Sequence, residues 1–223
     1  WQEDLKPSNM KTLTLEEART WYQDTDAVHD FDHILRVYRM AERLARAEGA
    51  DMEIVRAAAL LHDAQGSDPG TAGARAAHHQ ASAAFAADVL SQKGWEQEKI
   101  DAVQHCILAH RFRNPDEMPA TLEAKIIFDA DKLDALGAVG AARVIAYATL
   151  AGTPFYEEPS TQFLKTGKEM KGERHSAYHE HLFKLRKLRD RMHTPTARTI
   201  ADKRLRYLDA FFERLIAEWM GEK

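Results

Sequence analysis

The stretch AAALLHDAQGSD places a histidine and an aspartate, His62 and Asp63, at the end of an apolar helical run. Small apolar residues before this pair indicate a buried helix, and burying an imidazole beside a carboxylate is costly unless both groups find partners. A second pair, His29 and Asp30, lies in a polar segment without periodicity. The sequence context therefore favours His62 and Asp63 as the pair that carries chemistry.

Two further polar side chains fall on apolar helix faces elsewhere in the chain. His33 begins a series at helical spacing, so its imidazole lies on or beside an inward face. That series continues with Val37, Met40 and Leu44. Asp131 lies on a stripe of small and apolar residues, where a carboxylate would be a buried, unpaired charge. That stripe consists of Ala124, Ile127, Ala135 and Ala138.

These four side chains, turned inward from three helices, would suit one divalent cation. Neutral imidazole nitrogen and hard carboxylate oxygen are ligands for Mn, Fe, Co, Ni, Zn or Mg, and two carboxylates balance the charge of the ion. The alternative is that His33 and Asp131 form a buried hydrogen-bonded pair, with His62 and Asp63 at a helix end that faces solvent. The spacing alone leaves both interpretations open.

The elements that must position these residues are helices. Apolar residues recur at helical spacing in almost every segment, without an alternating strand pattern or an Asn-Gly or Asp-Gly hairpin turn. Thr14 with Glu17 predicts a capping box, and Thr194 before Pro195 predicts the start of the last helix. We therefore expect an all-α fold with helices over residues 14–25, 32–48, 51–64, 74–93, 96–111, 120–150, 175–192 and 195–220.

The chain divides by composition into three parts. We expect residues 1–13 to be a disordered lead or a cloning remnant, and residues 14–150 to form the metal-binding core. The segment 151–172 is too long for a connector and is rich in Gly, Pro and Ser, which predicts a lid or substrate loop. Residues 151–223 would pack on the core, so that the chain forms one compact unit. The last helix should pack through Leu205, Leu208, Phe212, Leu215 and Trp219.

Composition excludes several classes of protein. A net charge of -4 and a pI near 6.3 give no basic field for a nucleic acid polymer. A mean hydropathy of -0.51 argues against a membrane protein, and the lack of a signal-like start predicts a cytoplasmic location. The single cysteine, Cys106, excludes an internal disulfide and is interpreted as a small buried side chain rather than a nucleophile.

Several separated motifs resemble one family. The order of His33, then LLHD with His62 and Asp63, then DADKLDALGAVGAAR with Asp131, resembles the HD-domain metal-dependent phosphohydrolases. HCILAHRF, HLFKLRKLRDRM and TARTIADKRLRYLDAFFERLIAEW are similar to the small stand-alone bacterial HD hydrolases, some of which split nucleoside triphosphates. The likeness covers residues 20 to 220 and implies an HD-domain helical bundle with a C-terminal helical extension. It assigns one divalent cation to His33, His62, Asp63 and Asp131.

The resemblance implies hydrolysis of a phosphate ester or anhydride, most specifically the conversion of a nucleoside triphosphate to a monophosphate and pyrophosphate. A bound cation can lower the pKa of water from about 15.7 toward roughly 7 and can polarise a phosphoryl oxygen. Arg36, which lies one turn after His33, and Lys132, which adjoins Asp131, are candidates for offsetting phosphate charge. Each of these two residues has an equally good interpretation as a surface residue.

Histidines outside the ligand set could supply proton transfer or substrate contacts. His110 ends the stripe Ile100, Val103, Ile107 and is the candidate acid or base, although a core histidine fits the same position. His79 and Lys184 are candidates for substrate binding. Periodicity leaves open whether His78 or His79 faces the metal, and a two-metal centre becomes possible if either joins His110. His105 is expected to face elsewhere.

The histidines of ERHSAYHEH could meet a polyphosphate or form an exposed helix face. Two functions rival hydrolysis: a nucleotide or metal sensor without turnover, and an HD-fold oxygenase with two irons, for which His78 or His79 would be a ligand. The C-terminal helices could also pair in a homodimer.

Overall fold

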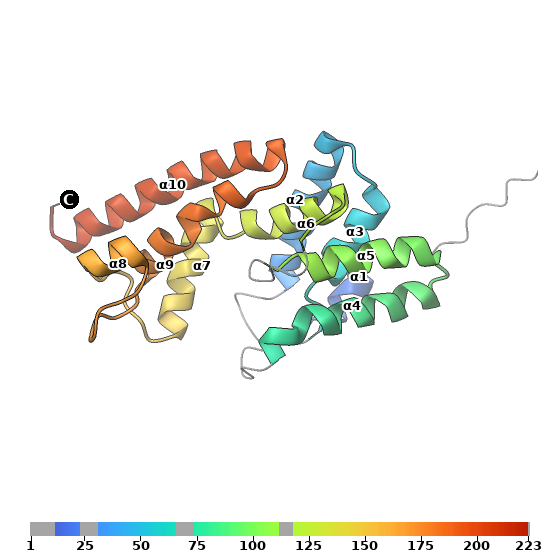
Figure 1. Cartoon of the computed structure of the whole chain (residues 1–223), viewed down its shortest axis with the longest axis horizontal. Helices are drawn as coiled ribbons and strands as arrows, with labels where there is room; N and C mark the ends of the chain where they lie inside the picture. The colour runs from blue at the N-terminus through green and yellow to red at the C-terminus, as the bar shows by residue number, and fades with distance from the viewer. Residues whose placement is uncertain (1–11, 23–30, 66–73, 112–117, 223) are drawn as a thin grey trace, which may run out of the picture. The chain divides into compact units, whose positions relative to one another are not determined.

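The computed structural model describes residues 12–22, 31–65, 74–111 and 118–222. These residues form helices joined by turns and loops, with no strand among them, so the predicted all-α fold is confirmed (Figure 1). The chain forms two compact units, Trp1–Phe128 and Asp129–Lys223. The predicted grouping into a core of residues 14–150 and an extension of 151–223 stays a prediction.

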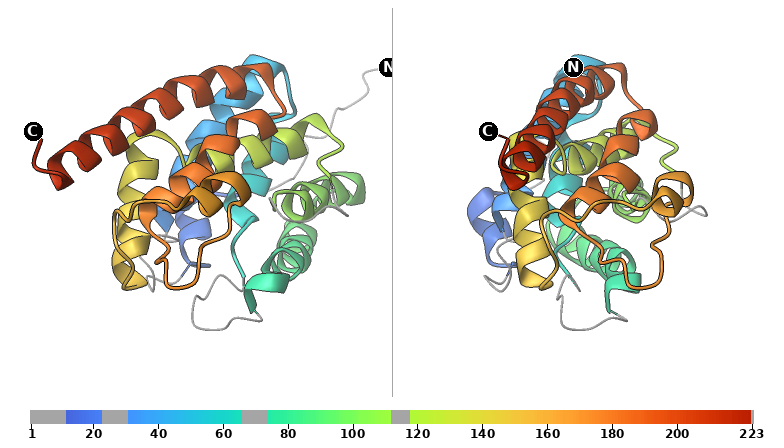
Figure 2. Two further views of the ribbon diagram at one scale, coloured as in Figure 1. Left: turned by 60° about the vertical axis from the view of Figure 1, so that its left-hand side comes forward. Right: turned by 90° about the vertical axis from the view of Figure 1, so that its left-hand side faces the viewer.

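The first unit is built around helix α3. Its helices are α1 (Leu15–Arg19), α2 (Phe31–Glu48), α3 (Met52–Leu61), α4 (Ala74–Gln92), α5 (Gln97–Ala109) and the start of α6 (Leu122–Leu133). Helix α3 contacts α1, α2, α4 and α5, and α4 and α5 lie side by side (Figures 1 and 2). The three alanines before Leu60 are buried, and their small side chains let neighbouring helices approach α3 closely.

Side-chain caps fix the starts of two of these helices. The Thr14 hydroxyl accepts a hydrogen bond from the backbone N–H of Glu17, as predicted. Helix α1 is shorter than expected, however, because the Thr20 hydroxyl donates to the Glu17 carbonyl and the chain turns there. The Asp51 carboxylate caps α3 by accepting from the backbone N–H groups of Glu53 and Ile54.

The second unit contains the end of α6 together with α7 (Gly137–Leu150), α8 (Thr161–Thr166), α9 (Ala177–Phe183), two 3-10 turns (Leu185–Lys187 and Arg189–Arg191) and α10 (Pro195–Trp219). Helix α10 contacts α7 and crosses it (Figure 2). Thr194 caps α10 as predicted, since its hydroxyl accepts from the Ala197 N–H. Leu208 and Phe212 of the predicted packing face are buried, but Trp219 is 59% exposed, so that face ends before Trp219.

The prediction of one helix over residues 120–150 is wrong. Helices α6 and α7 are separated by a turn and lie at 63° to each other. The buried Asp134 carboxylate forms an ion pair with Arg143 across this turn. A Cβ at Gly140 would lie 2.2 Å from the Ala135 carbonyl oxygen, so only glycine allows the chain to fold back so closely.

No single helix among the described residues is long and apolar enough to cross a membrane, although α6 and α7 together meet that criterion as a bent pair.

The segment after α7 has more structure than the predicted loop, because it contains α8. The Glu173 carboxylate organises it by accepting hydrogen bonds from the Ser160 N–H (2.7 Å), the Ser160 hydroxyl (2.7 Å) and the Met170 N–H (2.6 Å). His179, which is buried, contacts the same carboxylate at 3.0 Å. A lid role for this segment stays a prediction.

We expect the contribution of Glu173 to stability to depend on pH. Hydrogen bonding, first from His179 and then from the Ser160 N–H, lowers the pKa of Glu173 to about 2. Because the folded-state pKa lies below the unfolded-state value of about 4.3, this contribution is present above pH 4.3 and lost as the pH falls toward 2. Urea unfolding of the wild type and of Glu173→Gln should therefore differ clearly at pH 5, and the difference should shrink by pH 3. A difference that stays constant over this range would contradict the assignment.

Candidate metal centre

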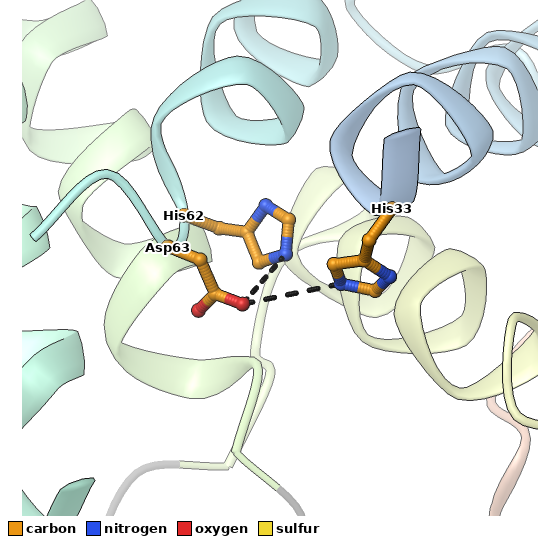
Figure 3. A group of neighbouring side chains, drawn as sticks. All are labelled: His33, His62 and Asp63. Atoms are coloured by element: carbon orange, nitrogen blue, oxygen red, sulfur yellow. Dashed lines mark ion pairs between the residues drawn. The ribbon is translucent and has the colours of Figure 1, made fainter. Parts of the chain in front are cut away.

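Three of the four predicted ligands come together in the first unit. His33 lies in the first turn of α2, His62 follows the last residue of α3, and Asp63 comes next (Figure 3). The Asp63 Oδ2 atom lies 3.5 Å from His62 Nε2 and 3.9 Å from His33 Nε2. Both histidines are buried, whereas the Asp63 side chain is 16% exposed. One ligand atom from each residue lies within 4.8 Å of the others, which is close enough for a shared cation.

A backbone contact fixes the orientation of the His62 ring. Nδ1 of His62 lies 3.0 Å from the Ala59 carbonyl oxygen, one turn earlier in α3. A carbonyl oxygen only accepts hydrogen bonds, so Nδ1 carries the proton and Nε2 keeps its lone pair. The His62 lone pair therefore faces Asp63, in the arrangement that metal-binding histidines use.

The unsatisfied atoms of this group fit a cation. His62 Nε2 and Asp63 Oδ1 are buried and have no hydrogen-bond partner among the described residues. Buried polar atoms normally have partners, so two buried atoms without one call for a ligand. Burial acts to raise the pKa of Asp63, but His62, His110 and His78 together hold that pKa well below its ordinary value. The carboxylate is therefore available in its charged form, and a positive ion would satisfy both acceptors.

A second group of possible ligands shares the same carboxylate. Asp63 Oδ1 lies 3.3 Å from His78 Nε2 and 3.5 Å from His110 Nε2, and the three residues could hold an ion. Nδ1 of His110 lies 2.5 Å from the Ile107 carbonyl oxygen, so Nδ1 carries a proton and Nε2 is the ring atom that faces Asp63. His110 is buried at the end of its apolar stripe, as its spacing predicted. The structure also answers the question left open by periodicity, because His78 is the neighbour that faces Asp63.

His79 turns toward Arg111 instead. Its Nδ1 atom lies 3.5 Å from a guanidinium nitrogen of Arg111, and its side chain is buried. Burial, followed by the positive charge of Arg111, lowers the pKa of His79 to about 4. His79 is therefore neutral near pH 7 and can accept a hydrogen bond from Arg111. Its predicted contact with substrate stays a prediction.

The fourth predicted ligand lies in the second unit. Asp131 is in the last turn of α6, and its carboxylate forms an ion pair with Lys132. The predicted stripe around Asp131 is only partly correct, because Asp131 is 16% exposed whereas Asp129 is fully buried. Ala138 is exposed, since the helix breaks before it. The roles of Asp131 as a ligand and of Lys132 as a phosphate contact stay predictions.

Arg36 and Lys184, the two other residues predicted to contact substrate, lie in different units. Arg36 is partly exposed on α2, one turn after His33. Lys184 follows α9 and donates a hydrogen bond to the Glu180 carboxylate at 2.6 Å. Neither location tests a contact with phosphate, so both roles stay predictions. The pair His29 and Asp30 lies outside the described residues.

Three further histidines and the cysteine contact residues other than Asp63. His105 accepts a hydrogen bond from the Ala120 N–H, so it faces away from Asp63 as expected. His179 and His181 are buried, which excludes a fully exposed histidine face, and His181 contacts the Asp209 carboxylate at 2.9 Å. Cys106 is buried and burial raises the pKa of its thiol, as expected for a packing residue. No second metal-binding group occurs around His179 and His181 in the described part of the second unit.

Sequence reasoning missed one residue beside the centre. The Tyr22 hydroxyl donates a hydrogen bond to the Leu60 carbonyl at 2.7 Å, just before His62 and Asp63. Burial, and then the charge of Asp63, raise the pKa of Tyr22 well above its ordinary value, so the hydroxyl keeps its proton. Tyr22 follows a short helix, and its partner Leu60 lies 38 residues later, so helical spacing does not indicate this contact.

Comparison with known proteins gives consistent matches. A family model for the HD domain matches residues 30–136. The Bacillus subtilis protein YpgQ is 34% identical over 208 residues, which cover 90% of this chain and 91% of YpgQ. The crystal structure of B. subtilis YpgQ in complex with ADP has a TM-score of 0.69 at 31% identity and covers 92% of this chain and 94% of that one.

A crystal structure of an HD-superfamily hydrolase from Bacillus thuringiensis has a TM-score of 0.67 at 31% identity and covers 92% of this chain and 96% of that one. These matches confirm the resemblance seen in the separated sequence motifs, and they extend well beyond the HD segment itself. The chain therefore belongs to the HD-domain family and has the fold of the HD-superfamily hydrolases.

Proposed function

We propose that this protein is a metal-dependent phosphohydrolase that acts on a nucleotide and releases pyrophosphate from a nucleoside triphosphate. The ligands of one divalent cation would be His33, His62, Asp63 and Asp131. The observation that carries this proposal is the gathering of His33 and His62 around the Asp63 carboxylate, in which the buried atoms His62 Nε2 and Asp63 Oδ1 have no hydrogen-bond partner among the described residues. A bound divalent cation would supply Lewis acidity toward a phosphoryl oxygen and would acidify a water molecule.

The protein side chains would orient substrate and accept a proton. His110 is the candidate base, because the Ile107 carbonyl holds its Nδ1 proton and leaves Nε2 able to accept one from water. Its position 3.5 Å from Asp63 lets the carboxylate stabilise the imidazolium that forms. Arg36 and Lys132 would offset phosphate charge, and Lys184 and His79 would contact the rest of the substrate.

The choice of a nucleotide as the substrate rests on a relative of this chain. YpgQ, which matches nearly the whole chain, has been crystallised in complex with ADP. An adenine nucleotide is therefore the first substrate class to test.

The test is a panel of nucleoside mono-, di- and triphosphates with Mn²⁺, Co²⁺, Ni²⁺, Zn²⁺ or Mg²⁺, with phosphate and pyrophosphate measured separately. We expect pyrophosphate and monophosphate in equal amounts from a triphosphate, and loss of the reaction when the metal is chelated. Phosphate as the main product would change the assignment to a phosphatase. Release of neither product with any metal would exclude hydrolysis.

The second group, Asp63, His78 and His110, supports one rival function. An oxygenase with two irons needs two adjacent metal positions, and this group offers the second position beside the first. Metal analysis after reconstitution separates the two cases, since the phosphohydrolase proposed here binds one metal ion per chain. A sensor would bind ADP tightly but leave every nucleotide of the panel intact.

A further inference from the structure

Tyr22 touches the segment that carries His62 and Asp63. Its hydroxyl donates to the Leu60 carbonyl at 2.7 Å, at the end of the helix that leads directly into His62 and Asp63. Carbonyls in the last turn of a helix lack partners within the helix, so the Leu60 carbonyl needs a donor from elsewhere in the chain. One hydroxyl therefore anchors the end of α3 from which His62 and Asp63 follow.

The ring of Tyr22 touches the element that carries His33. Its centroid lies 5.7 Å from the ring centroid of Phe31, in a tilted arrangement typical of favourable aromatic pairs. Phe31 is the first residue of α2, is buried, and precedes His33 by two residues. Tyr22 therefore contacts both segments that carry candidate ligands: the start of α2, before His33, and the end of α3, before His62 and Asp63.

We propose that Tyr22 is a positioning residue that sets the distance between His33 and the His62–Asp63 turn, and that its hydroxyl raises the affinity for the metal ion. The proposal rests on the metal site proposed above. Residues that orient metal ligands without touching the metal typically change metal affinity by 10–100-fold when replaced. The effect arises because a ligand displaced by a fraction of an ångström weakens every bond to the ion.

The test is Tyr22→Phe, which removes the hydroxyl and keeps the ring against Phe31. We expect Mn²⁺ affinity, measured by titration calorimetry or by the electron paramagnetic resonance signal of free Mn²⁺, to fall about tenfold. The absorption bands of the Co²⁺-loaded protein should shift, because the carboxylate of Asp63 changes its angle to the metal. The midpoint of thermal unfolding without metal should fall by only about 2–4 °C.

The matched control is Tyr38→Phe. Tyr38 lies on α2 beside Glu42 and Arg56, so its hydroxyl can be removed without touching the candidate ligands. We expect wild-type Mn²⁺ affinity and an unchanged Co²⁺ spectrum for this control. If Tyr22→Phe folds poorly, Phe31→Leu weakens the same contact from the α2 side and should also lower Mn²⁺ affinity.

Wild-type Mn²⁺ affinity in Tyr22→Phe, together with an unchanged Co²⁺ spectrum, would overturn the proposal and leave Tyr22 a structural residue. Failure of the wild type itself to bind Mn²⁺, Co²⁺ or any other divalent ion would instead contradict the proposed function. The two failures are therefore distinguishable within one set of titrations.

Discussion

Replacement of Asp63 by alanine is expected to abolish metal binding and to reduce nucleotide hydrolysis at least about a thousandfold, which corresponds to about 4 kcal/mol of transition-state stabilisation. The large effect follows from the position of this one carboxylate. Its Oδ2 atom faces His33 and His62, while its Oδ1 atom faces His78 and His110. Loss of the side chain therefore removes the negative charge from both groups of possible ligands at once.

Two further variants test whether the loss of metal binding depends on the negative charge and on the position of Asp63. Asp63→Asn keeps the shape but removes the charge, and we expect it to lose metal binding nearly as completely as Asp63→Ala. Asp32→Asn is the matched control, because Asp32 is an exposed acid beside His33 in the first turn of α2. Metal content by mass spectrometry and the initial rate of pyrophosphate release check all three. Full metal occupancy in Asp63→Ala would mean that the centre lies elsewhere.

The parts of the fold that obey local rules could be predicted from the sequence. Thr194 and Pro195 mark the start of α10 because a capping hydroxyl and a fixed φ angle act within one turn. His110 is buried because it continues an apolar stripe at helical spacing, and that spacing is a property of its own helix. The same reasoning placed His33 on the inward face of α2, where it meets His62 and Asp63.

Features that depend on distant segments could not be predicted in this way. Residues 134–136 break the predicted helix because Asp134 pairs with Arg143 and because Arg204 of α10 donates to the Leu133 carbonyl. Neither partner can be found from helical spacing. His78 and His79 have equally apolar neighbours, and only the packing of α4 on α5 shows that His78 faces Asp63 while His79 faces Arg111.

Asp129, the buried carboxylate of α6, is the clearest case of a feature that depends on a distant segment. Asp129 is fully buried and accepts three hydrogen bonds of 2.8 Å, from the backbone N–H of His193, the backbone N–H of Thr194 and the Thr194 hydroxyl. These donors lie at the start of α10, more than sixty residues later in the chain. Asp129 therefore ties the end of α6 to the first turn of α10, two residues before Asp131.

We expect Asp129→Ala to lower the free energy of unfolding by about 3–5 kcal/mol, because it leaves the three donors at the start of α10 without this acceptor. Asp129→Asn should lose less, since one oxygen remains, although its amide N–H₂ must then face other donors. The matched control is Asp190→Ala, an acid of the same unit that is 78% exposed and should cost no more than about 0.5 kcal/mol. Urea unfolding followed by circular dichroism measures all three variants.

A double-mutant cycle with Thr194→Val tests whether the loss comes from this contact. Valine keeps the shape of Thr194 but removes the hydroxyl that donates to Asp129 and caps α10. If the two side chains act together, the double variant should lose less than the sum of the single losses, by about 1 kcal/mol or more. Additive losses would show that the Thr194 hydroxyl is not coupled to Asp129. An Asp129→Ala variant within about 1 kcal/mol of the wild type would show that α10 is anchored by its apolar contacts with α7 instead.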